Sequence, residues 1–143
     1  MAGGEWLVTS CEEASKAKSS GMAFAHRFEE LEVWKSSKEL SLEIYGHFRN
    51  SRDFGFRDQI QRAAVSVMNN IAEGFERRTK QDFARFLDQA KGSAGEVRSM
   101  LSLAESLNYM PKEEAEALQR KCETLSRSIG AFSASLRRKT AST

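Results

Sequence analysis

The side chains that most often perform catalysis or hold a metal are scarce in this sequence. Its 143 residues include two histidines, His26 and His47, and two cysteines, Cys11 and Cys122. Zinc sites need closely spaced ligands, and bundles that bind two iron ions need the pattern Glu-x-x-His. Neither pattern occurs, because the cysteines lie far apart and Glu43 precedes His47 by four positions rather than three. We therefore predict a non-enzymatic protein without a metal ion or another cofactor.

Polar residues form a second candidate site. They recur at spacings of three and four residues in two segments, which places each set on one flank of a helix. We expect the two flanks to face each other in an interhelical or intersubunit hydrogen-bond network, with Arg62 paired to Glu96 or Glu73. The alternative is that both are solvated helix faces. The predicted network consists of Gln59, Arg62, Ser66, Asn70, Glu73, Ser93 and Glu96.

Basic residues gather in two stretches of the chain. The net charge is only +2, with 22 basic against 20 acidic residues, but a nearly neutral chain can carry a local basic patch. Such a patch would neutralise phosphates without reading a base sequence. Ordinary solubilising charge is the alternative. The predicted nucleic-acid-binding residues are Arg77, Arg78, Lys80, Arg137, Arg138 and Lys139.

Four long helices are expected to position these groups. Apolar residues recur with helical spacing in four segments, and short segments of turn composition separate them. In an antiparallel bundle of this kind, the start of the third helix and the end of the fourth lie at the same end, so both basic stretches meet there. The helices are expected at Phe28–Phe48, at Phe56–Glu73 with Gly74 as C-cap, from Thr79 to a stop at Asn108, and from near Pro111 onward.

The third and fourth helices each carry a seven-membered apolar stripe whose spacings alternate between three and four residues. This heptad pattern is typical of left-handed helix packing. The stripes are Phe83, Leu87, Ala90, Ala94, Val97, Leu101 and Ala104, and Ala115, Leu118, Cys122, Leu125, Ile129, Phe132 and Leu136. Nine glycines and one proline are too few for a β-sandwich or barrel. The predicted fold is an all-α, up-down-up-down antiparallel four-helix bundle.

The N-terminal segment differs from the rest. Residues 1–25 are small, rich in serine and without a sustained apolar stripe, so we predict a weakly structured leader or tail before a bundle domain at residues 26–143. Residues 1–21 should contribute little to stability, and Met22 is a candidate start. The longest apolar run is too short to span a bilayer and no secretory signal is evident. We therefore expect a cytoplasmic protein that has no membrane partner.

An oligomer is expected from the first helix. It carries a second apolar stripe, Val33, Leu40 and Ile44, beside the one that a lone bundle would bury. Exposed apolar surface of this kind usually marks an interface. We therefore predict that these three residues contact other copies of the chain.

Several short motifs together resemble a known family. They are Phe28-Glu29-Glu30-Leu31-Glu32-Val33-Trp34, Gln59-Ile60-Gln61-Arg62-Ala63-Ala64, Asn70-Ile71-Ala72-Glu73-Gly74, Phe83-Ala84-Arg85-Phe86-Leu87, Ala90-Lys91-Gly92-Ser93 and Leu107-Asn108-Tyr109. In combination they resemble the four-helix-bundle proteins encoded in intervening sequences of bacterial large-subunit rRNA genes. Those are similar to the accessory variability protein of diversity-generating retroelements. The resemblance covers about Phe28 to Leu136.

The resemblance implies a bundle that assembles as a ring-like homopentamer. In the retroelement branch it also implies nucleic-acid binding and a reverse transcriptase as partner. The sequence departs from the family at Val67-Met68-Asn69, where a proline is common, so an unbroken second helix is expected. The leading functional hypothesis is an oligomeric scaffold that associates with RNA or DNA. The alternative is a structural or protein-interaction bundle whose charge is incidental.

Overall fold

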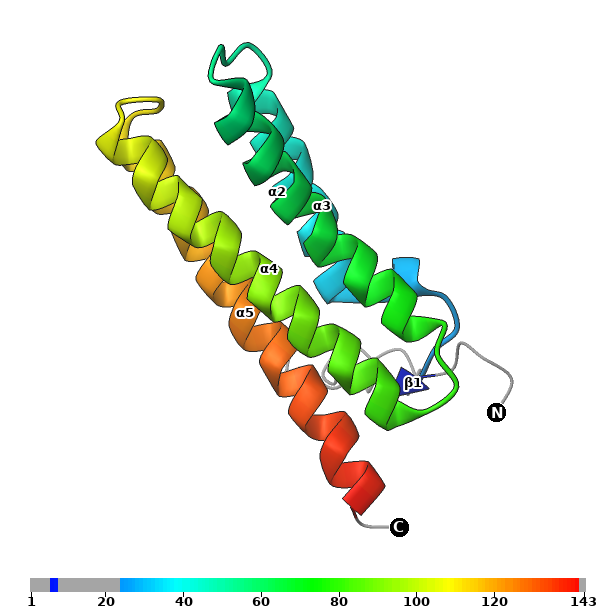
Figure 1. Cartoon of the computed structure of the whole chain (residues 1–143). Coiled ribbons are helices and arrows are strands. Elements are labelled where there is room, and N and C mark those ends of the chain that lie inside the picture. The colour runs from blue at the N-terminus through cyan, green and yellow to red at the C-terminus, as the bar shows by residue number, and fades with distance from the viewer. Residues whose placement is uncertain (1–5, 8–23, 142–143) are drawn as a thin grey trace.

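The computed structural model describes residues 6–7 and 24–141, with side chains from Ala25 to Arg138. A 3-10 turn, η1 (Phe28–Glu30), precedes four helices: α2 (Glu32–Phe48), α3 (Phe54–Phe75), α4 (Lys80–Ser106) and α5 (Lys112–Ala141). Figure 1 shows two antiparallel hairpins, α2 with α3 and α4 with α5, joined by the short α3–α4 turn. The predicted all-α four-helix bundle is confirmed, and α3 is unbroken as expected.

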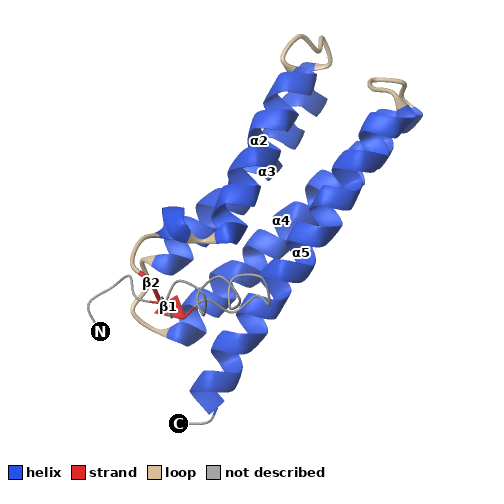
Figure 2. Cartoon of the chain, turned by 180° about the vertical axis from the view of Figure 1, so that it is seen from behind, coloured by secondary structure: helices blue, strands red, loops and turns tan. Residues whose placement is uncertain are grey.

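Two very short strands precede the bundle. In β1 (Trp6–Leu7) and β2 (Phe24–Ala25), Trp6 lies opposite Ala25 in an antiparallel pair. Figure 2 shows them at the end of the bundle where the chain's C-terminus lies. Apart from these four residues, the segment 1–25 lies outside the described residues, and so does the prediction that it is weakly structured.

The two heptad stripes form the centre of the core. All seven members of the α4 stripe are fully buried, and the seven of the α5 stripe are at most 5% exposed. Aromatic edges join the helices: Phe83 contacts Phe75 of α3 and Phe132 of α5, with ring centroids 6.1 and 5.2 Å apart. Cys122 is part of this core, and burial raises the pKa of its thiol to about 12. It is a small apolar core residue, as its place in the heptad predicts.

The ends of α4 lie where the sequence predicts them, whereas the start of α2 does not. Thr79 caps α4, because its Oγ1 accepts a hydrogen bond from the Asp82 amide at 3.1 Å. The helical segment of α4 ends before Asn108, whose φ of 58° is a left-handed conformation that asparagine tolerates. The first α-helix begins at Glu32 rather than Phe28. Leu31 is extended and fully buried, so the chain leaves the helical path to place that side chain in the core.

Gly74 is not the C-cap that its position suggested. It lies within α3, which continues to Phe75. A Cβ atom built on Gly74 would lie 2.7 Å from the Phe86 Cβ and 2.9 Å from the Phe83 Cδ1, both on α4. Gly74 is therefore required because α4 packs directly against the α3 backbone here. This close approach positions the start of α4 beside the end of α3.

Among the described residues, none of the helices is long and apolar enough to cross a membrane.

Candidate nucleic-acid interface

The two predicted basic stretches lie at the same end of the molecule. Arg77 and Arg78 belong to the α3–α4 turn, Lys80 is the first residue of α4, and Arg137 and Arg138 lie near the end of α5. Figure 1 shows the turn and the C-terminus at the lower end of the bundle. The side chain of Lys139 lies outside the described part. We call this surface the basic end and define it as Arg77, Arg78, Lys80, Arg85, Arg137 and Arg138.

Arg85 is a member that sequence reasoning missed. It lies one helical turn into α4, and its Nε and Nη2 donate hydrogen bonds to the Asp82 Oδ1 at 3.1 and 2.8 Å. Its side chain is 55% exposed, so the guanidinium still faces solvent. Its place in the sequence could have indicated it, since five residues of helix put Arg85 only about 7.5 Å along α4 from Lys80.

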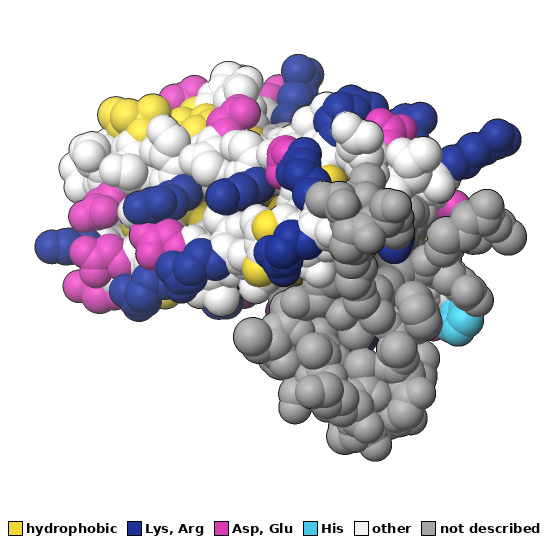
Figure 3. All heavy atoms as spheres, turned by 90° about the horizontal axis from the view of Figure 1, so that it is seen from below, with side chains coloured by type: hydrophobic (Ala, Val, Ile, Leu, Met, Phe, Trp, Pro, Cys, Tyr) yellow, Lys and Arg dark blue, Asp and Glu magenta, His cyan; other side chains and the backbone are white. Residues whose placement is uncertain are grey.

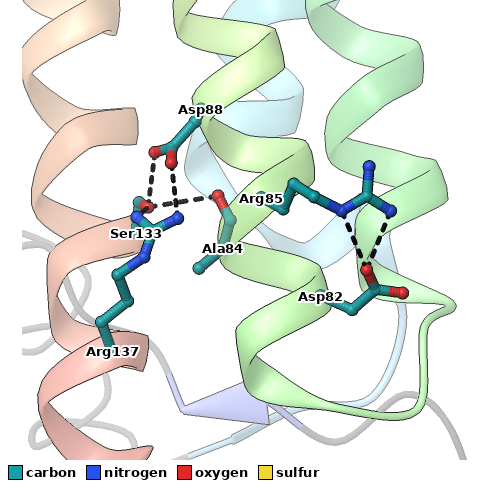
Figure 4. A network of polar contacts seen from close by, with 6 residues as sticks. All are labelled: Asp82, Ala84, Arg85, Asp88, Ser133 and Arg137. Carbon is teal, nitrogen blue, oxygen red and sulfur yellow. Dashed lines mark hydrogen bonds and ion pairs between the residues drawn. The ribbon is translucent and has the colours of Figure 1, made fainter.

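Arg137 is held by α4 instead of extending freely into solvent. Its Nη2 donates to the Asp88 Oδ2 at 2.6 Å and its Nη1 donates to the Ser133 Oγ at 2.6 Å. The Ser133 hydroxyl lies 2.7 Å from the Asp88 Oδ1 and 3.2 Å from the Ala84 carbonyl oxygen (Figure 4). Asp88 therefore neutralises most of the charge that Arg137 would offer to a phosphate. The cluster joins α4 to α5 and is a structural contact first.

Three basic side chains at this end lack an acidic partner. Within the described part of the chain, Arg78, Lys80 and Arg138 form no ion pair, and Arg78 and Arg138 are exposed. Acids also lie on the same stretch of α3, the α3–α4 turn and α4: Glu73, Glu76, Asp82 and Asp88. Three of them contact Arg77, Arg85 or Arg137. Viewed from below in Figure 3, lysine and arginine side chains are interspersed with acids. The cations without an acidic partner thus come from the α3–α4 turn, the start of α4 and the end of α5.

The Asp88–Arg137 contact predicts a pH dependence of stability. Partial burial raises the pKa of Asp88, but hydrogen bonds from Arg137 and Ser133 outweigh it, so the pKa is lowered overall. A lowered carboxyl pKa adds stability above the unfolded pKa, about 3.9, and this stability disappears as the pH falls through the folded pKa. We expect Asp88→Asn to reduce the free energy of unfolding at pH 7 and to flatten its decline in acid.

Urea unfolding of both proteins at several pH values measures this effect. Because the pair acts as a unit, Asp88→Asn combined with Arg137→Gln should be little worse than Asp88→Asn alone. Parallel pH profiles for Asp88→Asn and the parent protein would show that the contact is irrelevant to acid stability.

The predicted polar residues lie along the junction of α3 and α4. The Gln59 Nε2 donates to Glu96, and the hydroxyls of Ser66 and Ser93 are 2.9 Å apart. Asn70 donates within α3, to the Ser66 carbonyl oxygen at 2.8 Å and to its hydroxyl at 3.0 Å. The structure thus brings five of the seven residues into contacts.

The other two members of the set behave differently from the expectation. Arg62 is exposed and forms no ion pair with Glu96 or Glu73 in the described part of the chain. The Glu73 Oε1 instead lies 3.7 Å from the Arg77 Nη2, one turn further along. The expected ion pair of Arg62 is therefore wrong. Its partners are taken, Glu96 by Gln59 and Glu73 by Arg77.

The predicted interface residues are in the core of the subunit. Val33, Leu40 and Ile44 are 2%, 3% and 0% exposed in the single chain. The reason given for an oligomer, a leftover apolar stripe on the first helix, is therefore wrong. α2 needs two apolar faces because it packs against α3 on one side and faces α5 on the other. The exposed large apolar side chains of this helix are Leu42 and Tyr45.

A groove of about 570 Å³ runs between α2 and α5. Val33, Leu40 and Leu125 contribute to its apolar floor, and an ion pair between Lys121 and Glu43 crosses it. Histidine and cysteine are absent from its lining, and no cluster of potential metal ligands occurs among the described residues. The polar groups of its lining are carboxylates, hydroxyls and the cations of Arg120 and Lys121. Sequence reasoning did not predict it, since periodicity does not reveal how far two helices diverge.

The fold places this chain in the class of antiparallel four-helix bundles. The family described as 23S rRNA-intervening sequence protein matches residues 29–131. The chain therefore belongs to that family, as its motifs predicted. It is similar to a protein of unknown function from the S23 ribosomal protein family of Bacteroides thetaiotaomicron, whose crystal structure is known. The TM-score is 0.64 and the identity 24%, over 68% of this chain and 94% of the other, which supports the fold. No curated protein matches the chain.

Proposed function

We propose that this protein is a non-enzymatic, oligomeric scaffold that binds nucleic acid through its basic end. The observation that carries the proposal is the convergence of Arg78 and Lys80 with Arg138, which is about 60 residues away along the chain, without acidic partners.

The chemistry of the basic end favours phosphate contacts over base recognition. Its cations are guanidinium and ammonium groups, which bind phosphate oxygens. Phe86, the aromatic side chain that Arg77 and Arg85 contact, is 7% exposed, so its ring is not available for stacking on a base. Binding without sequence preference is expected, because phosphate contacts carry no sequence information.

Fluorescence anisotropy with the full chain tests the proposal. The probes are a labelled single-stranded RNA of random sequence and a labelled DNA duplex. We expect binding to both at about 50 mM salt, and a steep loss of affinity as the salt concentration rises. Absence of binding at that low salt concentration would favour the alternative, a bundle that serves only as a structural or protein-interaction module.

The oligomeric part of the proposal draws on the outer face of α4. Gly92 and Gly95 are exposed in the middle of this helix, and none of the described side chains or neighbouring segments lies within 4 Å of a Cβ built on either. Glycine there destabilises a helix by about 1 kcal/mol relative to alanine. A close approach by another copy of the chain, in a homopentamer as the family resemblance implies, would explain two such residues.

Alanine at both positions separates the two possibilities. In an isolated subunit, Gly92→Ala with Gly95→Ala should stabilise α4, since open space surrounds both Cβ positions. At an interface between copies, the added methyl groups should push the subunits apart and lower the mass measured by light scattering. We expect the lower mass. Gly46→Ala on α2, also in open space, is the control and should leave the mass unchanged. An unchanged mass together with a higher melting temperature for the double variant would mean that this face is solvated.

A further inference from the structure

Two arginine side chains of the basic end share one aromatic ring. The guanidinium carbon of Arg77 lies 4.5 Å from the centroid of the Phe86 ring, and that of Arg85 lies 4.7 Å from the same centroid. Both distances are within the range of about 6 Å for a cation–π contact. Arg77 comes from the α3–α4 turn and Arg85 from α4, so Phe86 brings together cations from two elements.

The backbone explains why Phe86 is in place. Gly74 lets the α4 backbone approach α3, and the Phe86 Cβ is the atom nearest to the missing Gly74 side chain. The ring is thus fixed by the core, with 7% of the residue exposed. Beside it, the Arg77 amide donates to the Gly74 carbonyl oxygen at 3.1 Å, which fixes the turn from which the Arg77 side chain extends.

The two guanidinium groups keep donors for an additional partner. Arg85 directs its Nε and Nη2 to a single oxygen of Asp82 (Figure 4). Arg77 lies 3.7 Å from Glu73, which is longer than a hydrogen bond. A guanidinium has five N–H donors, so both groups can donate to an anion while they remain beside the ring. Side chains that are already held lose less conformational entropy when they bind.

We infer that Phe86 is a positioning residue that holds Arg77 and Arg85 for contact with a phosphate of the nucleic-acid backbone. This inference rests on the proposed function and adds to it one aromatic side chain and one cation, Arg85. The ring acts on affinity through the two arginines and does not touch the nucleic acid.

A double-mutant cycle with the labelled RNA tests the inference. Phe86→Leu keeps an apolar side chain but removes the ring face, and we expect it to weaken binding about two- to fivefold at low salt. The slope of affinity against salt concentration should stay nearly unchanged, because both charges remain. In a protein that already carries Arg77→Gln and Arg85→Gln, Phe86→Leu should have no further effect.

A second variant, Arg85→Lys, tests the same contact from the side of the cation. It tests the inference even if Phe86→Leu fails to fold, or if the protein with Arg77→Gln and Arg85→Gln binds too weakly to measure. Arg85→Lys keeps the charge but loses the planar group that stacks on the ring, and it leaves the Arg77 contact intact, so it should weaken binding, but less than Phe86→Leu does. If the parent protein binds RNA while neither Phe86→Leu nor Arg85→Lys changes the affinity, the inference is wrong and the proposed function stands. The inference also fails if Phe86→Leu weakens binding equally in both backgrounds. If the parent protein does not bind, both fail.

Discussion

Replacing Gly74 by alanine should destabilise the protein by about 1–3 kcal/mol, even though alanine is the better helix former. The new Cβ would lie 2.7 Å from the Phe86 Cβ, an atom that moves only with the α4 backbone. Relief of the clash requires α4 to shift away from α3, which opens the core around Phe83. In a chain of this size, each kcal/mol lowers the melting temperature by roughly 4 °C.

Thermal unfolding followed by circular dichroism measures this effect. Gly46→Ala is the matched control, because Gly46 also lies in a helix but has nothing within 4 Å of its Cβ position. It should be neutral or stabilising, as expected for an exposed helical site. Equal melting temperatures for the Gly74→Ala and Gly46→Ala variants would contradict the close approach of α4 to α3. Gly74→Val should be worse than Gly74→Ala, since a branched side chain meets both Phe83 and Phe86.

The helices could be predicted from the sequence because their core positions repeat strictly. The seven apolar residues from Phe83 to Ala104 form one stripe along α4. Helical spacing alone therefore predicts that these residues are buried. The start of α4 was also predictable, since Thr79 and Asp82 have the chemistry and spacing of a cap.

Other features depend on three-dimensional distances that spacing does not encode. The sequence suggested that Gly74 ends a helix, whereas the structure shows that it admits a neighbouring backbone. Arg137 looked like a free cation, but Asp88 and Ser133, which lie on α4 and on its own helix, hold it. Charge at a helix end can be counted from sequence, but whether an acid neutralises it depends on which side chains the packing brings together.

The apolar faces of α2 are another feature that the sequence alone could not assign. Two apolar stripes on one helix indicate two contacts, and periodicity does not say whether the second contact is made within the subunit or with another copy. The structure assigns Ile44 and its neighbours to the subunit's own core. An interface must therefore use surface that is exposed in the single chain, such as the face of α4 that carries Gly92 and Gly95.

Reversing three charges at the basic end should abolish binding to nucleic acid. Arg78→Glu, Lys80→Glu and Arg138→Glu remove the cations that lack acidic partners and put carboxylates in their place. Phosphates would then meet like charges, which is unfavourable at any distance within the Debye length, about 10 Å at 0.1 M salt. Arg78 and Arg138 are exposed, and Lys80 lies outside the core cluster at the first position of α4, where glutamate is tolerated. The helical content and oligomeric mass should therefore not change.

The control carries the same net charge at the opposite end of the bundle. Arg49, Arg52 and Lys112 are exposed at the end where the α2–α3 and α4–α5 connections lie. Their reversal to glutamate should weaken binding only slightly, through the long-range field of the protein. Equal losses in the two triple variants would mean that net charge, and not the basic end, determines the affinity.

The salt dependence of RNA binding tests the central claim most directly. For the parent protein, the logarithm of the association constant should fall linearly with the logarithm of the salt concentration, with a slope of about −0.7 per phosphate contacted on a single strand. Removing Arg78, Lys80 and Arg138 should make this slope shallower by roughly 2, and the variant reversed at the opposite end should keep the parent slope. A parent protein whose binding does not change with salt, or a slope that stays unchanged when the three cations are replaced by glutamine, would contradict the proposal that this end binds the nucleic-acid backbone.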